Sequence, residues 1–257
     1  MRVLITGGGH GIGRATAERL LDRGHEVAVL DIEQDHLDDL PGEITTYQGD
    51  VYDRERVEEV LDGEELDVLV NCAGHQALGA IEDMAMDDVE QHFETNLFGL
   101  LQVTKAALPT LKERDGRIVN VSSLAGKTVA PYWGAYAASK HAVEAVSDAL
   151  RLELSRFDVD VVVIEPGAIR TGFNEKGARN LERYLPDSAY AENYRRKLAS
   201  AFTGASPETA AKTLVTAVET DRPSARYTVT WQAWLFPKLK AVLPTWLWDR
   251  LVLWHED

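Results

Sequence analysis

The chain contains 257 residues, with 27 basic and 42 acidic side chains and a formal net charge of −15. A chain of this length buries roughly 70% of the surface that its unfolded form exposes, so we expect one domain over residues 1–257 with a substantial core. A single cysteine, Cys72, excludes an internal disulfide framework and a cysteine-based metal cluster, and no metal site is predicted. The acidic balance argues against nucleic acid as a partner, because surfaces that bind phosphate backbones are basic.

The N-terminal segment places only Arg2 ahead of a short apolar run, which is unlike the long apolar stretch of a secretory signal. No window offers about 20 uninterrupted apolar residues, so no transmembrane span is expected. Together with the single cysteine, these features favour a reducing compartment, and we expect a cytoplasmic protein.

Short β-branched runs alternate with longer amphipathic stretches, a pattern typical of βαβ units stacked into a parallel sheet. The predicted strands are Arg2–Thr6, Glu26–Asp31, Ile44–Asp50, Val68–Asn71, Arg117–Ser122, Asp160–Glu165 and Arg226–Thr230. The sequence therefore predicts an α/β fold with a doubly wound parallel sheet of about seven strands and helices on both faces. Its ligand site is expected at the carboxyl ends of the strands.

Helical patterns lie between these strands, over residues 14–23, 54–61, 86–113 and 133–157. Gly24 is a plausible stop for the first helix, and Asp53 precedes the second. Ser206 followed by Pro207 predicts the N-cap and first residue of a further helix.

Two segments break the alternation. Residues 172–204 are too long for a simple connection, and we expect them to cover a ligand site as a lid. Residues 231–257 contain five of the six tryptophans, and residues 226–257 carry four basic and three acidic side chains, so the remaining chain has a net charge of −16. For this tail three interpretations stay open: packing over the sheet edge, a subunit interface, or a monotopic membrane contact with Lys238 and Lys240 as anchors.

A glycine-rich turn, Thr6-Gly7-x3-Gly11-x-Gly13, follows the first predicted strand and opens the first helix. Glycines there allow the close approach of a pyrophosphate, which backbone N–H groups and the helix dipole hold. Asp31 ends the second strand, where its carboxylate can accept hydrogen bonds from the adenosine ribose and repel a 2′-phosphate. This pattern favours NAD over NADP as the cofactor. The plainer interpretations are that the glycines form an ordinary strand-to-helix turn and that Asp31 is a surface aspartate.

Tyr136 and Lys140 stand four residues apart in a predicted helix, so their side chains share one face. Proton exchange with an alcohol or carbonyl needs a group that titrates near neutral pH, and lowering a tyrosine pKa by ~3 units corresponds to roughly 4 kcal/mol of phenolate stabilisation. The Lys140 ammonium could supply part of this, so a lowered Tyr136 pKa is predicted. Ser123 precedes Tyr136 by 13 residues and ends the fifth strand.

The ordered set of motifs extends over residues 1–230. It consists of TGGGHGIG at residues 6–13, Asp31, Asp50-Val51, Asn71-Cys72-Ala73-Gly74, Asn96, Ser122-Ser123, Tyr136, Lys140 and the segment from Pro166 to Thr171. This set resembles the short-chain dehydrogenase/reductase family in its single-domain branch, and the joint order is far more specific than any one motif. The resemblance implies a Rossmann-type sheet.

The resemblance also implies roles for individual residues. Tyr136 would be the general acid/base, Lys140 would bind the nicotinamide ribose and lower the Tyr136 pKa, Ser123 would orient the substrate oxygen, and Asn96 would hold a water in a proton relay. The implied cofactor contacts, besides Tyr136 and Lys140, are Thr6, Gly7, Gly11, Ile12, Gly13, Asp31, Asp50, Val51, Asn71, Ala73, Gly74, Pro166, Gly167, Ile169 and Thr171. The cofactor would be NAD, with NADP left open by His10, which occupies a position where NADP-preferring relatives often carry a basic residue.

Several positions keep an alternative. Ser122 competes with Ser123, Asn96 could merely cap or kink its helix, and Cys72 is expected to be a small buried packing residue. For the substrate we expect contacts from Ser123, Trp133 and Phe173, and further aromatic or aliphatic side chains (Tyr132, Tyr184, Leu185) would suit an apolar alcohol or ketone. Ordinary packing of these side chains against the sheet is equally open.

The sequence thus predicts an NAD(P)-dependent oxidoreductase that interconverts a secondary alcohol and a ketone or aldehyde, in a branch that resembles 17β-hydroxysteroid and retinol dehydrogenases. A homodimer or homotetramer is expected. The rival from another class is a non-catalytic dinucleotide sensor or scaffold that kept the fold. A nucleotide-sugar epimerase or dehydratase would need a larger C-terminal domain than the roughly 85 residues after Thr171 allow.

Overall fold

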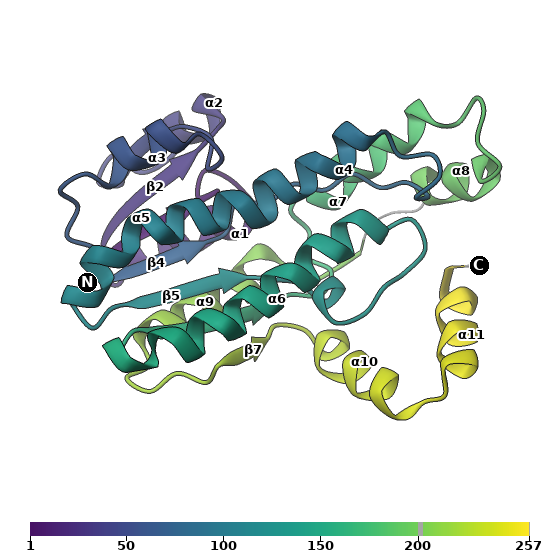
Figure 1. Ribbon diagram of the computed structural model, residues 1–257. Helices are drawn as coiled ribbons and strands as arrows, with labels where there is room; N and C mark the ends of the chain where they lie inside the picture. The colour runs from purple at the N-terminus through teal and green to yellow at the C-terminus, as the bar shows by residue number, and fades with distance from the viewer. Residues whose placement is uncertain (200–202, 257) are drawn as a thin grey trace.

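The computed structural model describes residues 1–199 and 203–256. Seven strands form one parallel sheet in the order β3-β2-β1-β4-β5-β6-β7, which confirms the predicted doubly wound α/β fold (Figure 1). The strands are β1 (Arg2–Thr6), β2 (Glu26–Asp31), β3 (Thr45–Gln48), β4 (Val68–Asn71), β5 (Arg117–Val121), β6 (Asp160–Glu165) and β7 (Arg226–Thr228).

Helices cover both faces of the sheet, and alternate side chains of each strand enter opposite layers. In β1, Val3 and Ile5 are buried on the side of α1 (Gly11–Leu21) and α9 (Pro207–Glu219), whereas Leu4 is buried on the other side. That second layer contains α3 (Arg54–Leu61), α5 (Leu100–Glu113) and α6 (Gly134–Leu154). Burial on both faces explains why the strands read as nearly continuous apolar runs.

The strand register brings the motifs together at one edge of the sheet. Thr6 pairs in register with Asn71, and Asn71 pairs with Asn120 of the neighbouring strand. The glycine turn, the loop after β4 and the turn after β5 therefore leave the sheet at the same end. This is the edge at which open parallel sheets bind ligands.

Three predicted strands are shorter than expected. β3 ends at Gln48 rather than at Asp50, because Asp50 begins a turn in which its carbonyl accepts from Asp53 N at 3.0 Å. β5 ends one residue before Ser122. β7 ends at Thr228, since Thr230 instead caps the next helix by accepting from Ala233 N at 3.4 Å.

The helix boundaries also differ in part. The predicted run 86–113 is divided into α4 (Met86–Phe93), a π-helical turn (Glu94–Gly99) and α5, and α6 is followed by a 3₁₀ turn at 155–157. The stop of α1 near Gly24 is confirmed by the left-handed φ of +83° at that glycine. Asp53 caps α3 as predicted by accepting from Arg56 N at 3.2 Å, and Pro207 is the first residue of α9.

The segment expected to be a lid contains α7 (Phe173–Arg179), a 3₁₀ turn (Asn180–Arg183) and α8 (Ala191–Ala199), whereas residues 200–202 lie outside the described residues. The short helix α2 (Gln34–Asp38) itself follows β2. Tyr194 of α8 is fully buried and donates to Asp83 Oδ2 at 2.5 Å, while its hydroxyl accepts from Ala80 N at 2.8 Å. These contacts fix the segment on the loop that follows β4.

The tail forms two helices, α10 (Trp231–Val242) and α11 (Thr245–Glu256), which extend away from the sheet beyond β7 (Figure 1). Trp248 is buried, and its ring lies 6.4 Å from that of Phe236 in α10, so this tryptophan packs between the two tail helices. The other four are exposed: Trp231, Trp234, Trp246 and Trp254. Among residues 1–199 and 203–256, no helix combines the length and hydropathy that crossing a membrane requires.

Candidate active site

The glycine turn between β1 and α1 leaves no room for side chains. Gly7 and Gly11 have left-handed φ values of +64° and +57°. A Cβ on Gly13 would lie 2.1 Å from the carbonyl oxygen of Gly7, and one on Gly7 would lie 2.7 Å from Ala73 Cα. The result is a backbone cradle at a helix N-terminus, which fits the pyrophosphate of a dinucleotide.

Thr6 and Asn71 join the strands behind this cradle. Thr6 Oγ1 accepts from Cys72 N at 3.1 Å and from Ala73 N at 3.2 Å, which fixes the loop after β4 against β1. The Asn71 amide donates to Thr104 Oγ1 at 3.0 Å and to Asn120 Oδ1 at 2.9 Å. The side chains of Thr6 and Asn71 therefore form hydrogen bonds within the protein. Any contact of this loop with a cofactor would come from the backbone from Ala73 onward.

Asp31 lies beside the glycine turn at the end of β2 and is nearly buried. Its Oδ2 accepts from Gly9 N at 2.9 Å, and its Oδ1 accepts from Glu33 N at 3.1 Å. The ring of His10 stacks on that of His36 at 5.0 Å. Burial, followed by the nearby His36, lowers the His10 pKa, so His10 offers little positive charge at neutral pH.

The remaining predicted cofactor contacts lie in loops at the same edge. A Cβ on Gly11 would lie 3.1 Å from Thr171 Cβ, and the carbonyl of Pro166 accepts from Leu124 N at 2.7 Å. Val51 is buried against Gly99. The other members are placed as follows: Ile12 packs against the core, Asp50 Oδ1 accepts from Tyr52 N at 2.9 Å, Gly167 packs on Thr230, and Ile169 pairs with Ala205.

Ser123 and Tyr136 form the centre of the site. The Ser123 side chain lies near that of Tyr136 and acts to lower the tyrosine pKa, and Ser123 Oγ accepts from Ala125 N at 3.1 Å at the start of a 3₁₀ turn (Leu124–Gly126). Ser122 Oγ is buried without a hydrogen-bond partner in the described chain. The structure thus brings Ser123, and not Ser122, to the tyrosine.

Lys140 lies on the same face of α6 as Tyr136, with its Nζ 5.9 Å from the centre of the tyrosine ring. The Nζ donates to the Val121 carbonyl at 2.9 Å, and burial lowers the Lys140 pKa to about 8. The predicted lowering of the Tyr136 pKa is wrong for this arrangement, since burial raises it to about 12. The loss of hydration around a buried phenolate outweighs the opposing effect of the Ser123 side chain.

Asn96 lies in the π-helical turn, so its helix is irregular at that residue, as one of the two interpretations expected. Its Oδ1 accepts from His75 N at 2.7 Å, and its Nδ2 donates to the His75 carbonyl at 3.0 Å and to Ser139 Oγ at 2.9 Å. Ser139 Oγ in turn donates to the Tyr136 carbonyl at 2.8 Å. Asn96 thereby links the loop after β4 to the tyrosine helix, with one Oδ1 lone pair left for a water.

Aromatic rings surround Tyr136. Trp133 lies 5.9 Å and Phe173 lies 6.2 Å from its ring centre. Trp133 also packs, with Tyr132, Tyr184 and Leu185, around the buried cluster that contains Leu181 and Tyr194. Two histidines near Tyr136 are not predicted from the sequence. His92 lies 6.3 Å from Tyr136, and His75 lies 5.1 Å from His92. The position of His75 directly after Gly74 could have indicated it, but nothing in the local sequence marks His92.

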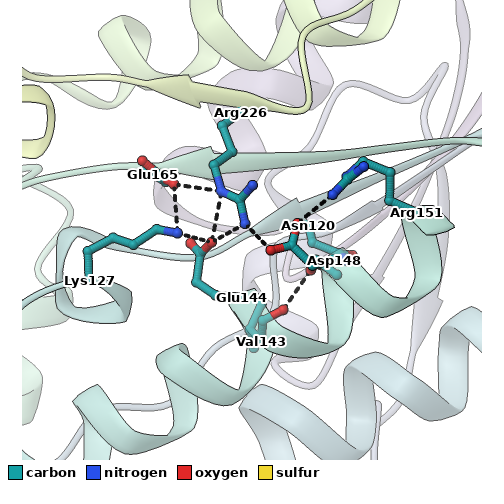
Figure 2. Close-up of polar contacts among 9 residues, drawn as sticks. Asn120, Lys127, Val143, Glu144, Asp148, Arg151, Glu165 and Arg226 are labelled. Carbon is teal, nitrogen blue, oxygen red and sulfur yellow. Dashed lines mark hydrogen bonds and ion pairs between the residues drawn. The ribbon is translucent and has the colours of Figure 1, made fainter. Parts of the chain in front are cut away.

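A charged network surrounds the middle of α6, and no pattern in the sequence predicts it (Figure 2). Glu144, one turn after Lys140, lies 2.7 Å from Lys127 Nζ and 3.2 Å from Arg226. Glu165 lies 3.3 Å from Arg226 Nε, and burial together with Glu144 raises the Glu165 pKa. The network joins the Ser123 turn, α6, the end of β6 and β7, whose members are far apart in the sequence.

Comparisons with known proteins point to one family. The family described as short chain dehydrogenase matches residues 1–182. The chain is 34% identical over 200 residues to 3-ketodihydrosphingosine reductase of Bacteroides thetaiotaomicron, covering 76% of this chain and 74% of that protein. It is 30% identical over 279 residues to mouse retinol dehydrogenase 7, covering 99% of this chain and 88% of that protein.

Solved structures agree as well. A short-chain dehydrogenase from Streptomyces avermitilis superposes with a TM-score of 0.81 at 30% identity, covering 99% of this chain and 96% of that one. The closed form of serine dehydrogenase complexed with NADP⁺ superposes with a TM-score of 0.77 at 28% identity, covering 89% and 94%. With its glycine cradle, its Ser123, Tyr136 and Lys140 group and these relatives, the chain belongs to the short-chain dehydrogenase/reductase family of oxidoreductases.

Proposed function

We propose that this oxidoreductase interconverts a secondary alcohol and a ketone or aldehyde, with Tyr136 as the general acid/base. The observation that carries the proposal is the proximity of the Ser123 side chain to Tyr136, with Lys140 on the same helix face. The loop after β4 borders both the cradle and this group, because a Cβ on Gly7 would lie 2.7 Å from Ala73 Cα and one on Gly74 would lie 4.0 Å from Lys140 Nζ. Proton transfer and hydride transfer can therefore occur at one carbon–oxygen bond.

In the carbonyl-reducing direction, the neutral phenol of Tyr136 donates its proton to the substrate oxygen, and in the oxidising direction the tyrosine takes that proton. Ser123 Oγ orients the same oxygen. Lys140 and Asn96 complete the site by binding the ribose and by holding a water that replaces the proton of the tyrosine. A bound nicotinamide supplies the hydride donor or acceptor, and its oxidised form adds a positive charge that favours the phenolate.

The coenzyme we propose is NAD, with NADP bound more weakly. Asp31 places a carboxylate where a ribose 2′-phosphate would come, and its two oxygens are held by backbone N–H groups, so it has little freedom to move away. His10 carries little compensating charge. The solved structure of serine dehydrogenase is complexed with NADP⁺, so this fold can also bind NADP.

The substrate we propose is largely apolar. Trp133 and Phe173 flank Tyr136 with their rings, and burial lowers the pKa of both His75 and His92, so these imidazoles remain neutral near pH 7. The names of two relatives point the same way, since retinol and 3-ketodihydrosphingosine both carry long hydrocarbon chains. We also propose that the protein is cytoplasmic and forms a homodimer or homotetramer.

The test is a panel of alcohols and ketones of increasing hydrocarbon length, assayed with NAD(H) and NADP(H) by nicotinamide absorbance. We expect turnover with at least one apolar substrate and a preference for NAD(H). Tight dinucleotide binding with no turnover on any member would favour the rival, a non-catalytic sensor. Turnover confined to short polar substrates would contradict the proposed apolar substrate class but not the proposed reaction.

A further inference from the structure

The C-terminal helices α10 and α11 expose four large aromatic side chains. The exposed fractions are 64% for Trp231, 54% for Trp234, 68% for Trp246 and 80% for Trp254. Single exposed apolar residues are ordinary, but four exposed tryptophans on two successive helices are a concentration of apolar surface that indicates an interaction site.

The exposed residues form one stripe on each helix. On α10, Trp231, Trp234, Lys238 and Val242 are exposed at helical spacing, and Lys238 Nζ lies 3.6 Å from the centre of the Trp234 ring. The opposite side of α10 faces the protein through buried Ala233 and through Lys240, which donates to the Lys127 carbonyl at 3.0 Å. The stripe of α10 thus faces outward from a helix that is firmly attached.

On α11 the corresponding stripe contains Trp246, Arg250, Leu253 and Trp254, with Asp249 at its edge. Trp248 points the other way and packs on Phe236 of α10. Within the described chain, the main contacts of α11 are with α10. Figure 1 shows α11 as an arm beyond the sheet and its helical layers.

We propose that the stripes of α10 and α11 are a monotopic anchor that docks the protein on the surface of a lipid bilayer. Tryptophan is enriched at the interface between headgroups and hydrocarbon, where its ring is apolar and its N–H remains wet. Lys238 and Arg250 lie within reach of the headgroups because their long side chains can extend from an apolar face to the polar region.

The charges decide between a bilayer and a second copy of the chain. The centres of protein–protein interfaces are depleted in lysine, whereas α10 places Lys238 in the middle of its stripe. Residues 231–257 carry three basic and three acidic side chains and are neutral overall, whereas the remaining chain has a net charge of −15, so the tail is the part of the protein that an anionic bilayer repels least. That asymmetry orients the tail toward the lipid. The anchor does not depend on the proposed reaction.

The test uses the full chain with phosphatidylcholine vesicles, alone and doped with phosphatidylglycerol. We expect co-sedimentation, a blue shift of tryptophan emission and quenching by brominated lipid. The variant with Trp234→Gln, Trp246→Gln and Trp254→Gln should lose on the order of tenfold or more in partitioning. Lys238→Gln should weaken binding to the doped vesicles at low salt by about fivefold. The matched control is Leu152→Gln, an exposed apolar residue of α6, which should bind as the wild type does.

Brominated-lipid quenching of the unmodified chain keeps the test valid even if the triple variant fails to fold. The proposal is overturned if vesicles of neither composition bind the chain, or if the triple variant folds and partitions as the wild type does. It is also overturned if the wild type is an oligomer in solution that the triple variant dissociates while neither binds vesicles. That outcome would assign the stripes to a second copy of the chain.

Discussion

The side chains of Ser123 and Tyr136 lie close enough for Ser123 to act on the tyrosine pKa, although one residue begins the turn after β5 and the other lies in the first turn of α6. This proximity exists because β5 and the N-terminal end of α6 reach the same edge of the sheet. A substrate oxygen that lies between the two side chains would be oriented by one and would exchange its proton with the other.

Serine replacements distinguish the two candidates after β5. Ser123→Ala should lower kcat by about 10²-fold, because it removes the hydroxyl that lies near Tyr136. Ser122→Ala is the matched control: its Oγ lacks a hydrogen-bond partner among the described side chains and faces Gly126, so kcat should change by less than about threefold. Steady-state kinetics on both variants tests this, and equal losses would contradict it.

Coenzyme choice should depend on the Asp31 carboxylate. Asp31→Asn keeps an acceptor for Gly9 N but removes the negative charge beside the ribose, so the ratio of NADPH to NADH affinity should rise by about tenfold or more. Asp35→Asn, on the exposed side of α2, removes the same charge without touching the turn. Fluorescence titration with both coenzymes gives the ratios. A ratio that moves equally in the two variants would show that only net charge matters.

The charged network of Figure 2 should contribute to stability. Glu144→Ala removes one of the two carboxylates, Glu144 and Glu165, that Lys127 and Arg226 share, and should cost about 2 to 3 kcal/mol of unfolding free energy. In contrast, Glu58→Ala removes the exposed partner of Arg54 and should cost no more than about 0.5 kcal/mol. Urea denaturation measures both values. Similar losses in the two variants would mean that burial of the network is unimportant.

Acid should destabilise the protein partly through His75. Burial lowers the His75 pKa from 6.5 to about 4, so between these pH values the unfolded chain binds a proton that the folded chain does not. The contribution to stability is fully present above pH 6.5 and is lost as the pH falls toward 4. Because part of the ring reaches solvent, we expect a loss of about 1 to 2 kcal/mol. In His75→Asn the unfolding free energy should fall less steeply over this range, and an unchanged slope would contradict the assignment.

Much of the fold could be predicted because a parallel sheet that is buried on both faces has strands of almost entirely apolar sequence. The strands of the parallel sheet are nearly continuous apolar runs, and all seven were found. The ends of these strands were less predictable, because a single hydrogen bond can determine where a strand stops. Thr230 reads as a β-branched strand residue, yet it caps α10 by accepting from Ala233 N.

The site could be predicted where a motif is local in sequence and not where it depends on packing. The glycine turn and the pair of Tyr136 and Lys140 are spaced by backbone geometry. The raised Tyr136 pKa, the position of His92 and the links of Glu144 depend on which segments meet in space. Composition marked the tail as unusual, but only its exposure separates Trp248 from the four tryptophans that face outward.

The central claim is that Tyr136 transfers the proton. The most direct test is Tyr136→Phe, which removes only the hydroxyl from a buried ring and leaves the glycine cradle untouched. The account predicts that this variant binds NADH with an affinity within about threefold of the wild type and loses turnover by about 10³-fold or more. Turnover at the wild-type level, with the coenzyme bound, would contradict it.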